Sequence, residues 1–210
     1  MFKSKSKIFT LILFILILIF YLVRNQFRDL DYEKYFKQND HLKIFCIILT
    51  TPERLFTHGK IVFSIWASKC TNFRFITVIT KTSKKFQTKN NFSQDIIGEP
   101  LNLHQPTNYL FENYNKLTNK VLNAFRDIFN EHKDYDWYLK IDDDSFLHYE
   151  NLQKFLNDKD PKSLTTYGYE ISDESGIIDG KFLMGGPGYI ISKSAFHLLG
   201  VELNKNMSFC

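Results

Sequence analysis

Three consecutive aspartates, Asp142, Asp143 and Asp144, carry the clearest potential for chemistry in this 210-residue sequence. In an extended chain Asp142 and Asp144 leave the same face, and their carboxylates lie about 6–7 Å apart along the strand. Two carboxylates at that spacing repel unless a cation lies between them, and ligands that offer only oxygen favour Mg²⁺ or Mn²⁺. Such an ion completes its shell with water and phosphate oxygens. The triplet therefore predicts a metal site for a substrate that carries a diphosphate, with the metal neutralising charge on the leaving diphosphate.

The same aspartates have a structural alternative, which is an acidic turn that caps a strand. They follow Tyr135–Ile141, a run that favours a buried strand, and a surface turn would not need such a strand. A second group, Gly185-Gly186-Pro187-Gly188, could let the backbone approach a ligand closely or could form a simple strand turn. The six histidines have no metal-ligand spacing, and no Ser-His-Asp or Cys-His arrangement stands out.

The elements that must position these groups alternate between strands and helices. Strands are predicted at residues 42–50, 73–80, 135–141, 164–169, 181–184 and 189–191, and helices at residues 55–67, 112–133, 150–156 and 193–200, the last with Ser192 as its N-cap. This alternation predicts a three-layer α/β domain with a mostly parallel sheet, in which ligands bind at the carboxyl ends of the strands. Thr50-Thr51-Pro52 and the three aspartates follow two such ends.

The N-terminal segment has the pattern of a membrane anchor. Residues 8–23 carry no charge, and as a helix they are about 24 Å long, which is short for a bilayer core of about 30 Å but tolerable in a thin early secretory membrane. A cleaved signal peptide needs small residues at its cleavage site, which are missing here, and a buried core helix is a further alternative. The favoured division is a cytoplasmic tail at 1–7, a transmembrane signal anchor at 8–23, a stem at 24–40 and a folded domain at 41–210.

Composition and charge narrow the function classes. With 44% hydrophobic and 24% charged residues, the chain is neither a disordered tail nor a fibre of the collagen type. Its net charge of +4 falls entirely within residues 1–30, whereas a nucleic-acid-binding protein carries its excess on the folded domain. No nucleic-acid partner is therefore expected. Two glycosylation sequons, at Asn91 and Asn206, favour a lumenal location for the domain.

The cysteines point to the same compartment. Cys46 lies in the first predicted strand and Cys70 just before the second, so a helix that returns to an adjacent strand could bring them together. A disulfide across that loop contributes about 3 kcal/mol in the chain-entropy model. Two buried thiols are the alternative, more usual in a cytosolic protein. With an N-terminal anchor the disulfide is favoured, and Cys210 is then left unpaired.

Several motifs resemble those of the animal core 1 β1,3-galactosyltransferases, part of a large β1,3-glycosyltransferase family that includes the fringe proteins. The matching segments are Trp137–Phe146 with the three aspartates, Ile48–Pro52 at the end of the first strand, Ile65–Cys70, Glu112–Lys120, and Met184–Ala195 with its Gly-Gly-x-Gly-Tyr block. The resemblance spans about residues 42–210. It implies a GT-A fold, a single-pass type II anchor in the Golgi or ER membrane, and inverting transfer of galactose from UDP-galactose to GalNAc-O-Ser/Thr of glycoproteins with Mn²⁺.

The resemblance also implies particular site residues. Asp142 and Asp144 match the metal-binding Asp-x-Asp, and Cys46 and Cys70 match a disulfide. The residues that would contact the nucleotide sugar are Leu49, Glu112, Asn113, Lys120, Asp142, Gly185 and Gly186. Tyr114 stands where the family pattern has Arg.

The family pattern continues beyond Cys210 with a Glu-Asp motif, a further Cys, a Trp and a metal-ligand His. An inverting transfer needs a general base, and by resemblance that carboxylate lies in this later part. The sequence is accordingly expected to be a fragment, a truncated gene model or an inactive product. The alternative functions are a lumenal, chaperone-like partner of a full-length transferase and a membrane-anchored glycan-binding module. A homodimer is also compatible with the sequence.

Overall fold

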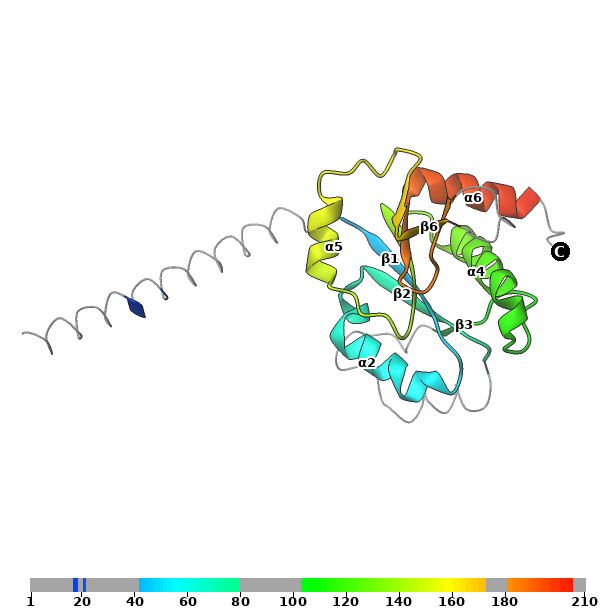
Figure 1. The fold of residues 1–210 in the computed structure, drawn as a ribbon. Helices are drawn as coiled ribbons and strands as arrows, with labels where there is room; N and C mark the ends of the chain where they lie inside the picture. The colour runs from blue at the N-terminus through cyan, green and yellow to red at the C-terminus, as the bar shows by residue number, and fades with distance from the viewer. Residues whose placement is uncertain (1–16, 19–20, 22–41, 80–102, 173–180, 206–210) are drawn as a thin grey trace, which may run out of the picture. The chain divides into compact units, whose positions relative to one another are not determined.

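The computed structural model describes residues 17–18, 21, 42–79, 103–172 and 181–205 (Figure 1). It divides into two units, residues 1–41 and 42–210. The predicted tail, the stem, most of the predicted anchor, both sequons and Cys210 lie outside the described residues, so those assignments stay predictions. Among the residues that are described, no helix has the length and apolar character needed to cross a bilayer.

A six-stranded sheet forms the centre of the second unit, with the strand order β3-β2-β1-β4-β8-β5. Its strands are β1 (Ile44–Leu49), β2 (Asn72–Ile76), β3 (Leu103–His104), β4 (Trp137–Asp142), β5 (Thr166–Gly168) and β8 (Tyr189–Ser192). β1 pairs in parallel with β2 and β4, β2 pairs in parallel with β3, and β8 is antiparallel to both β4 and β5. A separate two-stranded sheet joins β6 (Glu170–Ser172) and β7 (Lys181–Leu183). The mostly parallel sheet that the sequence predicted is therefore present.

Alternation along the strands divides the core between the two faces of the sheet. In β4, Trp137, Leu139 and Ile141 pack into one hydrophobic cluster, as predicted, while Tyr138 packs into the other. β1 is buried at every position because it is central and covered on both faces, which explains its continuous apolar run.

Helices cover both faces of the sheet (Figure 1). One face packs against α2 (His58–Ile65) and α5 (Tyr149–Leu156), and the other against α4 (Leu117–Glu131) and α6 (Lys193–Lys205). The three-layer architecture expected from the sequence is thus confirmed. At the N-terminus of α6 the Ser192 hydroxyl accepts a hydrogen bond from the Ala195 amide at 3.2 Å, so Ser192 is the predicted N-cap.

Element boundaries differ from the prediction at several points. The helix expected from residue 112 begins as a short turn, η3 (Tyr114–Lys116), because the Asn113 side chain caps the Asn115 amide, and regular α4 starts at Leu117. The helix expected at residues 55–67 is divided into η1 (Arg54–Phe56), α2 and η2 (Ala67–Lys69), with Trp66 out of the helical region at φ −144°. β3 and β6 were not predicted, since strands of two and three residues leave almost no periodic signal.

The structure contains the favoured disulfide between Cys46 and Cys70. Cys46 lies in β1 and Cys70 directly follows η2, with Cα atoms 6.2 Å apart. Because η2 returns the chain to β2 beside β1, the disulfide joins the segment that enters β2 to its neighbouring strand. The alternative of two buried free thiols is therefore wrong for the structure.

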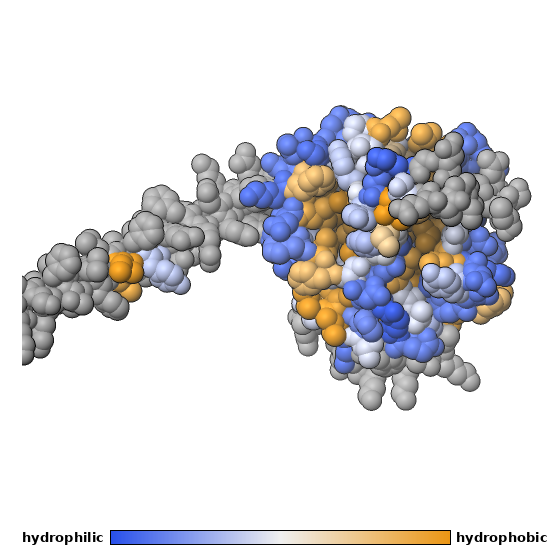
Figure 2. All heavy atoms as spheres, in the orientation of Figure 1, coloured by the Kyte–Doolittle hydropathy of each residue, from blue (hydrophilic) through white to orange (hydrophobic). Residues whose placement is uncertain are grey.

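The surface seen in Figure 2 mixes hydrophilic residues with exposed hydrophobic ones. Large apolar side chains that stay at least one third exposed include Leu110, Phe111, Tyr114 and Phe146. Three of these four belong to the stretch of chain around η3, which borders the pocket described next.

Candidate functional site

A pocket of about 300 Å³ opens at the carboxyl ends of β1 and β4, where a doubly wound sheet is expected to bind ligands. The two strands lie side by side in the sheet, with Leu49 opposite Asp142. The pocket is lined by Leu49, Thr50, Thr51, Arg54, Tyr109, Glu112, Asn113, Tyr114, Leu117, Lys120, Asp142, Asp143 and Asp144. Four of these side chains are carboxylates and two are cations, so charge pairing determines the geometry of the pocket.

The three aspartates do not continue the extended strand, which corrects the expectation that Asp142 and Asp144 leave one face of it. β4 ends at Asp142, and the chain then turns, with the Ser145 amide donating to the Asp142 carbonyl at 3.1 Å. The Asp143 amide donates to the Leu49 carbonyl at 3.0 Å and fixes the turn to β1. As a result the Asp143 side chain is buried, at 4% exposure, whereas that of Asp144 is 57% exposed. All three carboxylates nevertheless line the pocket.

Asp142 is paired with Lys140 from its own strand. Lys140 Nζ lies 2.7 Å from Asp142 Oδ1 and donates to the Gly185 carbonyl at 2.8 Å. The Lys140 side chain is only 4% exposed, so its charge is neutralised within the protein. Burial raises the pKa of the Asp142 carboxyl above its ordinary value, although the Lys140 ammonium acts in the opposite direction.

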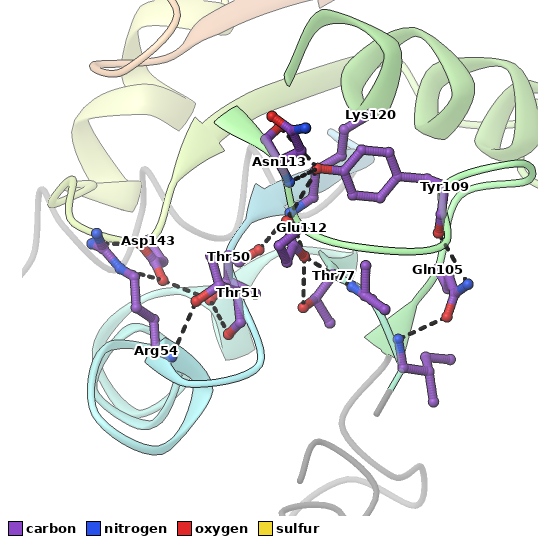
Figure 3. A network of polar contacts seen from close by, with 12 residues as sticks. Thr50, Thr51, Arg54, Thr77, Gln105, Tyr109, Glu112, Asn113, Lys120 and Asp143 are labelled. Atoms are coloured by element: carbon purple, nitrogen blue, oxygen red, sulfur yellow. Dashed lines mark hydrogen bonds and ion pairs between the residues drawn. The ribbon is translucent and has the colours of Figure 1, made fainter. Parts of the chain in front are cut away.

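Asp143 is held by Thr50, which directly follows β1, and by Arg54 of η1. The Thr50 hydroxyl donates to Asp143 Oδ2 at 2.6 Å, and Arg54 reaches both carboxylate oxygens, with Nε at 3.2 Å from Oδ2 and Nη2 at 2.7 Å from Oδ1. Arg54 Nη2 also lies 3.1 Å from Asp144 Oδ2. Figure 3 shows the Arg54 side chain directed at Asp143 beside Thr50. The three aspartates are therefore paired with two cations of the protein, Lys140 and Arg54, which the sequence analysis did not predict.

A second network, on the other side of the pocket, centres on Lys120 of α4. Its Nζ donates to the Thr50 carbonyl at 2.6 Å and to the two Glu112 carboxylate oxygens at 2.9 and 2.8 Å. Burial lowers the pKa of Lys120, and the Glu112 carboxylate opposes that change. Glu112 Oε1 also accepts from the Thr77 hydroxyl and the Val78 amide just after β2 (Figure 3). The pair thus joins α4 to the ends of two strands.

Tyr109 closes this network from the segment before η3. Its hydroxyl donates to Glu112 Oε2 at 3.3 Å and accepts from the Asn113 amide at 3.0 Å, and its ring lies 5.5 Å from Lys120 Nζ. Burial raises the pKa of the Tyr109 hydroxyl, so it stays protonated at neutral pH. Tyr114, which also lines the pocket, is exposed and offers an aromatic face at its mouth.

The glycine-rich turn lies against the end of β4 and does not line the pocket. The Gly188 amide donates to the Gly185 carbonyl at 3.2 Å, which makes a tight turn. Gly188 has φ +94°, and a Cβ there would lie 2.8 Å from the Lys140 carbonyl, so the close backbone approach is to β4. The Gly185 and Gly186 carbonyls accept hydrogen bonds from Lys140 Nζ and the Ser145 hydroxyl. Gly185 and Gly186 therefore support the aspartate turn, and their predicted contact with a nucleotide sugar stays a prediction.

The structure brings most of the sequence-predicted residues to this one pocket. Those that line it are Leu49, Glu112, Asn113, Lys120, Asp142 and Asp144. Sequence reasoning missed Arg54, Tyr109 and Lys140. Charged residues usually face solvent, so no local pattern distinguishes Lys140 in its predicted strand or Arg54, which directly precedes the helix predicted at residues 55–67. Tyr109 lies in a segment without periodicity, where only the three-dimensional contacts show its role.

The described residues include no cluster of three or more His, Cys, Asp or Glu side chains arranged to hold a metal ion. Asp142 and Asp144 still offer hard oxygen donors at the edge of one pocket, which fits an ion that takes its remaining ligands from phosphate and water. His104 of β3, which sequence analysis left without a role, pairs with Asp127 of α4 at 3.2 Å, and neither residue lines the pocket.

One comparison with known proteins bears on this site. The family model described as Galactosyltransferase matches residues 108–184. The matched stretch contains Glu112, Lys120 and the three aspartates, together with all of β4. The match supports a glycosyltransferase that transfers galactose, with a nucleotide-sugar donor and a glycan acceptor.

Proposed function

We propose that this chain carries the donor site of a metal-dependent β1,3-galactosyltransferase, which uses UDP-galactose and transfers galactose with inversion to GalNAc-O-Ser/Thr of glycoproteins. One observation carries the proposal. The pocket at the carboxyl ends of β1 and β4 collects the three aspartates and the Glu112–Lys120 pair, and these residues lie inside the stretch that matches the galactosyltransferase model. The β1,3 linkage and the GalNAc acceptor come from the resemblance to the core 1 enzymes.

The donor chemistry of the aspartates fits a divalent ion, for which we propose Mn²⁺. Asp142 and Asp144 would hold it, and because two carboxylates leave much of its shell open, phosphate oxygens of the donor would complete the coordination. When bound, such an ion stabilises the negative charge that develops on the leaving diphosphate. Binding would need both carboxylates deprotonated, and the contact of Arg54 with Asp144 would compete with it.

The remaining polar groups in and around the pocket orient the aspartates or hold the surrounding elements together. Lys140 fixes the orientation of Asp142, and Thr50 with Arg54 fixes Asp143. The Glu112–Lys120 pair, bonded to the Thr50 carbonyl, holds α4 against the end of β1. Each carboxylate of the pocket is committed to a cation, so we assign the role of general base to none of them. In our proposal the base lies outside the described residues.

We also propose a lumenal location in the Golgi or ER, with the domain tethered by a type II anchor. The support from the described residues is the Cys46–Cys70 disulfide, because structural disulfides persist in oxidising compartments. A glycoprotein acceptor would meet the enzyme in the same compartment. The anchor itself rests on the sequence pattern of residues 8–23.

A second candidate function is a chaperone-like partner of a full-length transferase, without turnover of its own. The observation in its favour is that each of the three aspartates is paired with a cation of the protein itself, Lys140 or Arg54. Such a protein would keep the fold and the pocket without binding a donor together with a divalent ion. Donor binding therefore separates the two functions.

The test is calorimetric titration of the purified protein with UDP, with and without MnCl₂. The proposed transferase should bind UDP only with the metal ion. In Asp144→Ala, the addition of MnCl₂ should no longer change the binding of UDP. Asp134→Asn is the matched control, because Asp134 is exposed and does not line the pocket. Equal UDP affinity with and without Mn²⁺ would contradict metal-dependent donor binding, and absence of UDP binding under both conditions would favour the second function.

A further inference from the structure

Arg54 differs from the other cations of the site in its access to solvent. Among the described residues that line the pocket, the cations are Arg54 and Lys120. Lys120 is 2% exposed, and its ammonium already has three acceptors, the Thr50 carbonyl and both Glu112 oxygens. The Arg54 side chain is 37% exposed. An anion that enters the pocket can therefore reach the guanidinium without breaking the Lys120 network.

The two acidic partners of Arg54 hold it with unequal strength. Asp143 is buried, receives Nε and Nη2 on its two oxygens, and is itself fixed by Thr50. A bidentate pair with a buried carboxylate is among the stronger polar contacts in proteins. Asp144 is exposed and shares only Nη2, and exposed ion pairs contribute little to stability. A ligand can thus displace Asp144 from Arg54 while Asp143 keeps the guanidinium in place.

The geometry of the guanidinium suits a phosphate group. Its planar fork presents several donors in fixed directions, which matches the oxygens of a phosphate. Its contacts with the aspartates use Nε and Nη2, and Nη1 has no hydrogen-bond partner among the described residues. With Asp144 displaced, Nη1 and one N–H of Nη2 have no acceptor among the described residues, and Arg54 lines the pocket, so both donors are available to an incoming anion.

We propose that Arg54 binds the diphosphate of the nucleotide-sugar donor, held in place by Asp143 and releasing Asp144 as the donor enters. This inference rests on the proposed function and adds a residue to its site. The released Asp144 carboxylate is then free to contact a divalent ion, so one movement serves both ligands. If Arg54 were only the structural counter-ion of buried Asp143, its loss should weaken the binding of UDP, uridine and Mn²⁺ alike.

The experiment compares ligands that differ in phosphate content. UDP and uridine are titrated into the full chain with MnCl₂ present, for the wild type, Arg54→Gln, Arg54→Lys and Lys69→Gln. Lys69 lies in η2, pairs with Glu150 and does not line the pocket, which makes it the control for lost charge. Arg54→Gln should weaken UDP binding by about tenfold to a hundredfold, the effect expected for a lost charge-assisted hydrogen bond, and should leave uridine binding within about twofold. Lys69→Gln should change neither.

A second titration, with Mn²⁺ alone, separates a binding role from a structural one. Because Arg54 competes for Asp144, Arg54→Gln should bind Mn²⁺ at least as tightly as the wild type while it binds UDP more weakly. Loss of UDP, uridine and Mn²⁺ binding together would show a structural role and overturn the inference. Thermal unfolding reports whether each variant is folded. If Arg54→Gln does not fold, Arg54→Lys decides, since it keeps the charge but loses the fork and should show the same selective loss of UDP binding.

The outcomes also distinguish this inference from the function on which it rests. Wild-type protein that binds UDP with Mn²⁺, together with an unchanged affinity in Arg54→Gln, would overturn the role of Arg54 and leave the donor site intact. Wild-type protein that binds no UDP with Mn²⁺ would overturn both. Selective loss of UDP binding in Arg54→Gln supports both.

Discussion

Lys140 and Asp142 lie two residues apart in β4, with side chains on the same face of the strand, and form an ion pair of 2.7 Å at the edge of the pocket. The lysine is the more buried partner and also holds the Gly185 carbonyl. A single buried cation therefore connects the aspartate turn to the glycine-rich turn. The position of Asp142 depends on a residue that itself does not line the pocket.

Lys140→Met should destabilise the protein by about 2–4 kcal/mol, because removal of one partner leaves a partly buried carboxylate and a carbonyl without their cation. The double variant Lys140→Met/Asp142→Asn should recover part of that loss. Urea unfolding of the four proteins in the cycle measures the coupling. Lys193→Met, which removes an exposed lysine 3.9 Å from Asp134, should change stability by less than about 0.5 kcal/mol. Additive losses in the cycle would contradict the pair.

Thr50→Val should cost about 1.5–3 kcal/mol, the usual worth of a hydrogen bond to a charged group. The substitution keeps the shape of the side chain but removes the donor that lies 2.6 Å from Asp143 Oδ2. Thr51→Val is the matched control, since the Thr51 hydroxyl accepts only a long 3.4 Å hydrogen bond from the Arg54 amide. Chemical unfolding should show the larger loss at residue 50, and equal losses at the two positions would argue against a special role for the Asp143 contact.

The Asp127 carboxylate makes the free energy of unfolding depend on pH. Burial acts to raise its pKa, but hydrogen bonds from His104 and from Thr107 outweigh it, so the pKa lies below the usual value. A depressed folded-state pKa stabilises the protein above the unfolded pKa of about 3.9, and the contribution is lost as the pH falls below that value.

Asp127→Asn should therefore lower the free energy of unfolding at pH 7 by about 1–3 kcal/mol, and the difference from the wild type should shrink between about pH 5 and pH 3. Urea titrations across this range provide the measurement. Asp134→Asn, at an exposed position, should follow the wild type throughout. If the difference in unfolding free energy between Asp127→Asn and the wild type stayed constant down to pH 3, the charge of Asp127 would not be its cause.

Gly200→Ala should destabilise the protein by about 1–3 kcal/mol, even though alanine is favoured over glycine within a helix by about 1 kcal/mol. Gly200 lies in α6 against the ring of Phe129 in α4, and a Cβ there would overlap that ring. Thermal unfolding should show the loss, with partial recovery in Gly200→Ala/Phe129→Leu. Leu198→Ala, on the exposed side of α6, serves as the control. A rise in stability for Gly200→Ala would show that the two helices adjust easily.

The sequence predicted the elements whose periodicity is strong and the residues that sit at their ends. The alternation of predicted strands with predicted helices was enough to infer the layers, and the strand ends at Thr50 and Asp142 indicated where the pocket lies. β3 was not predicted, because a strand of two residues that pairs only with β2 is too short to show an alternating hydrophobic pattern.

The rest of the site depends on contacts between residues far apart in the chain. The aspartate turn is set by the Asp143 amide binding the Leu49 carbonyl, across 94 positions of sequence, so local spacing wrongly suggested an extended Asp142–Asp144 pair. The roles of Arg54 and Lys140 follow from the same turn. A charged residue in a helix or strand is ordinarily solvated, and only the folded chain shows which carboxylate it meets.

The charge balance of the pocket has a consequence for the order in which ligands arrive. Four carboxylates line the pocket, Asp142, Asp143, Asp144 and Glu112, and they are balanced by two cations of the lining, Arg54 and Lys120, and by Lys140 behind Asp142. A free nucleotide diphosphate approaches a surface with a negative excess, whereas the same nucleotide already bound to a divalent ion brings the missing positive charge with it. For the proposed donor, association should therefore be faster when metal and nucleotide are premixed than when the nucleotide meets the protein first. Stopped-flow mixing in the two orders measures this difference. Identical association rates would show that the charge of the pocket does not affect the association of the nucleotide.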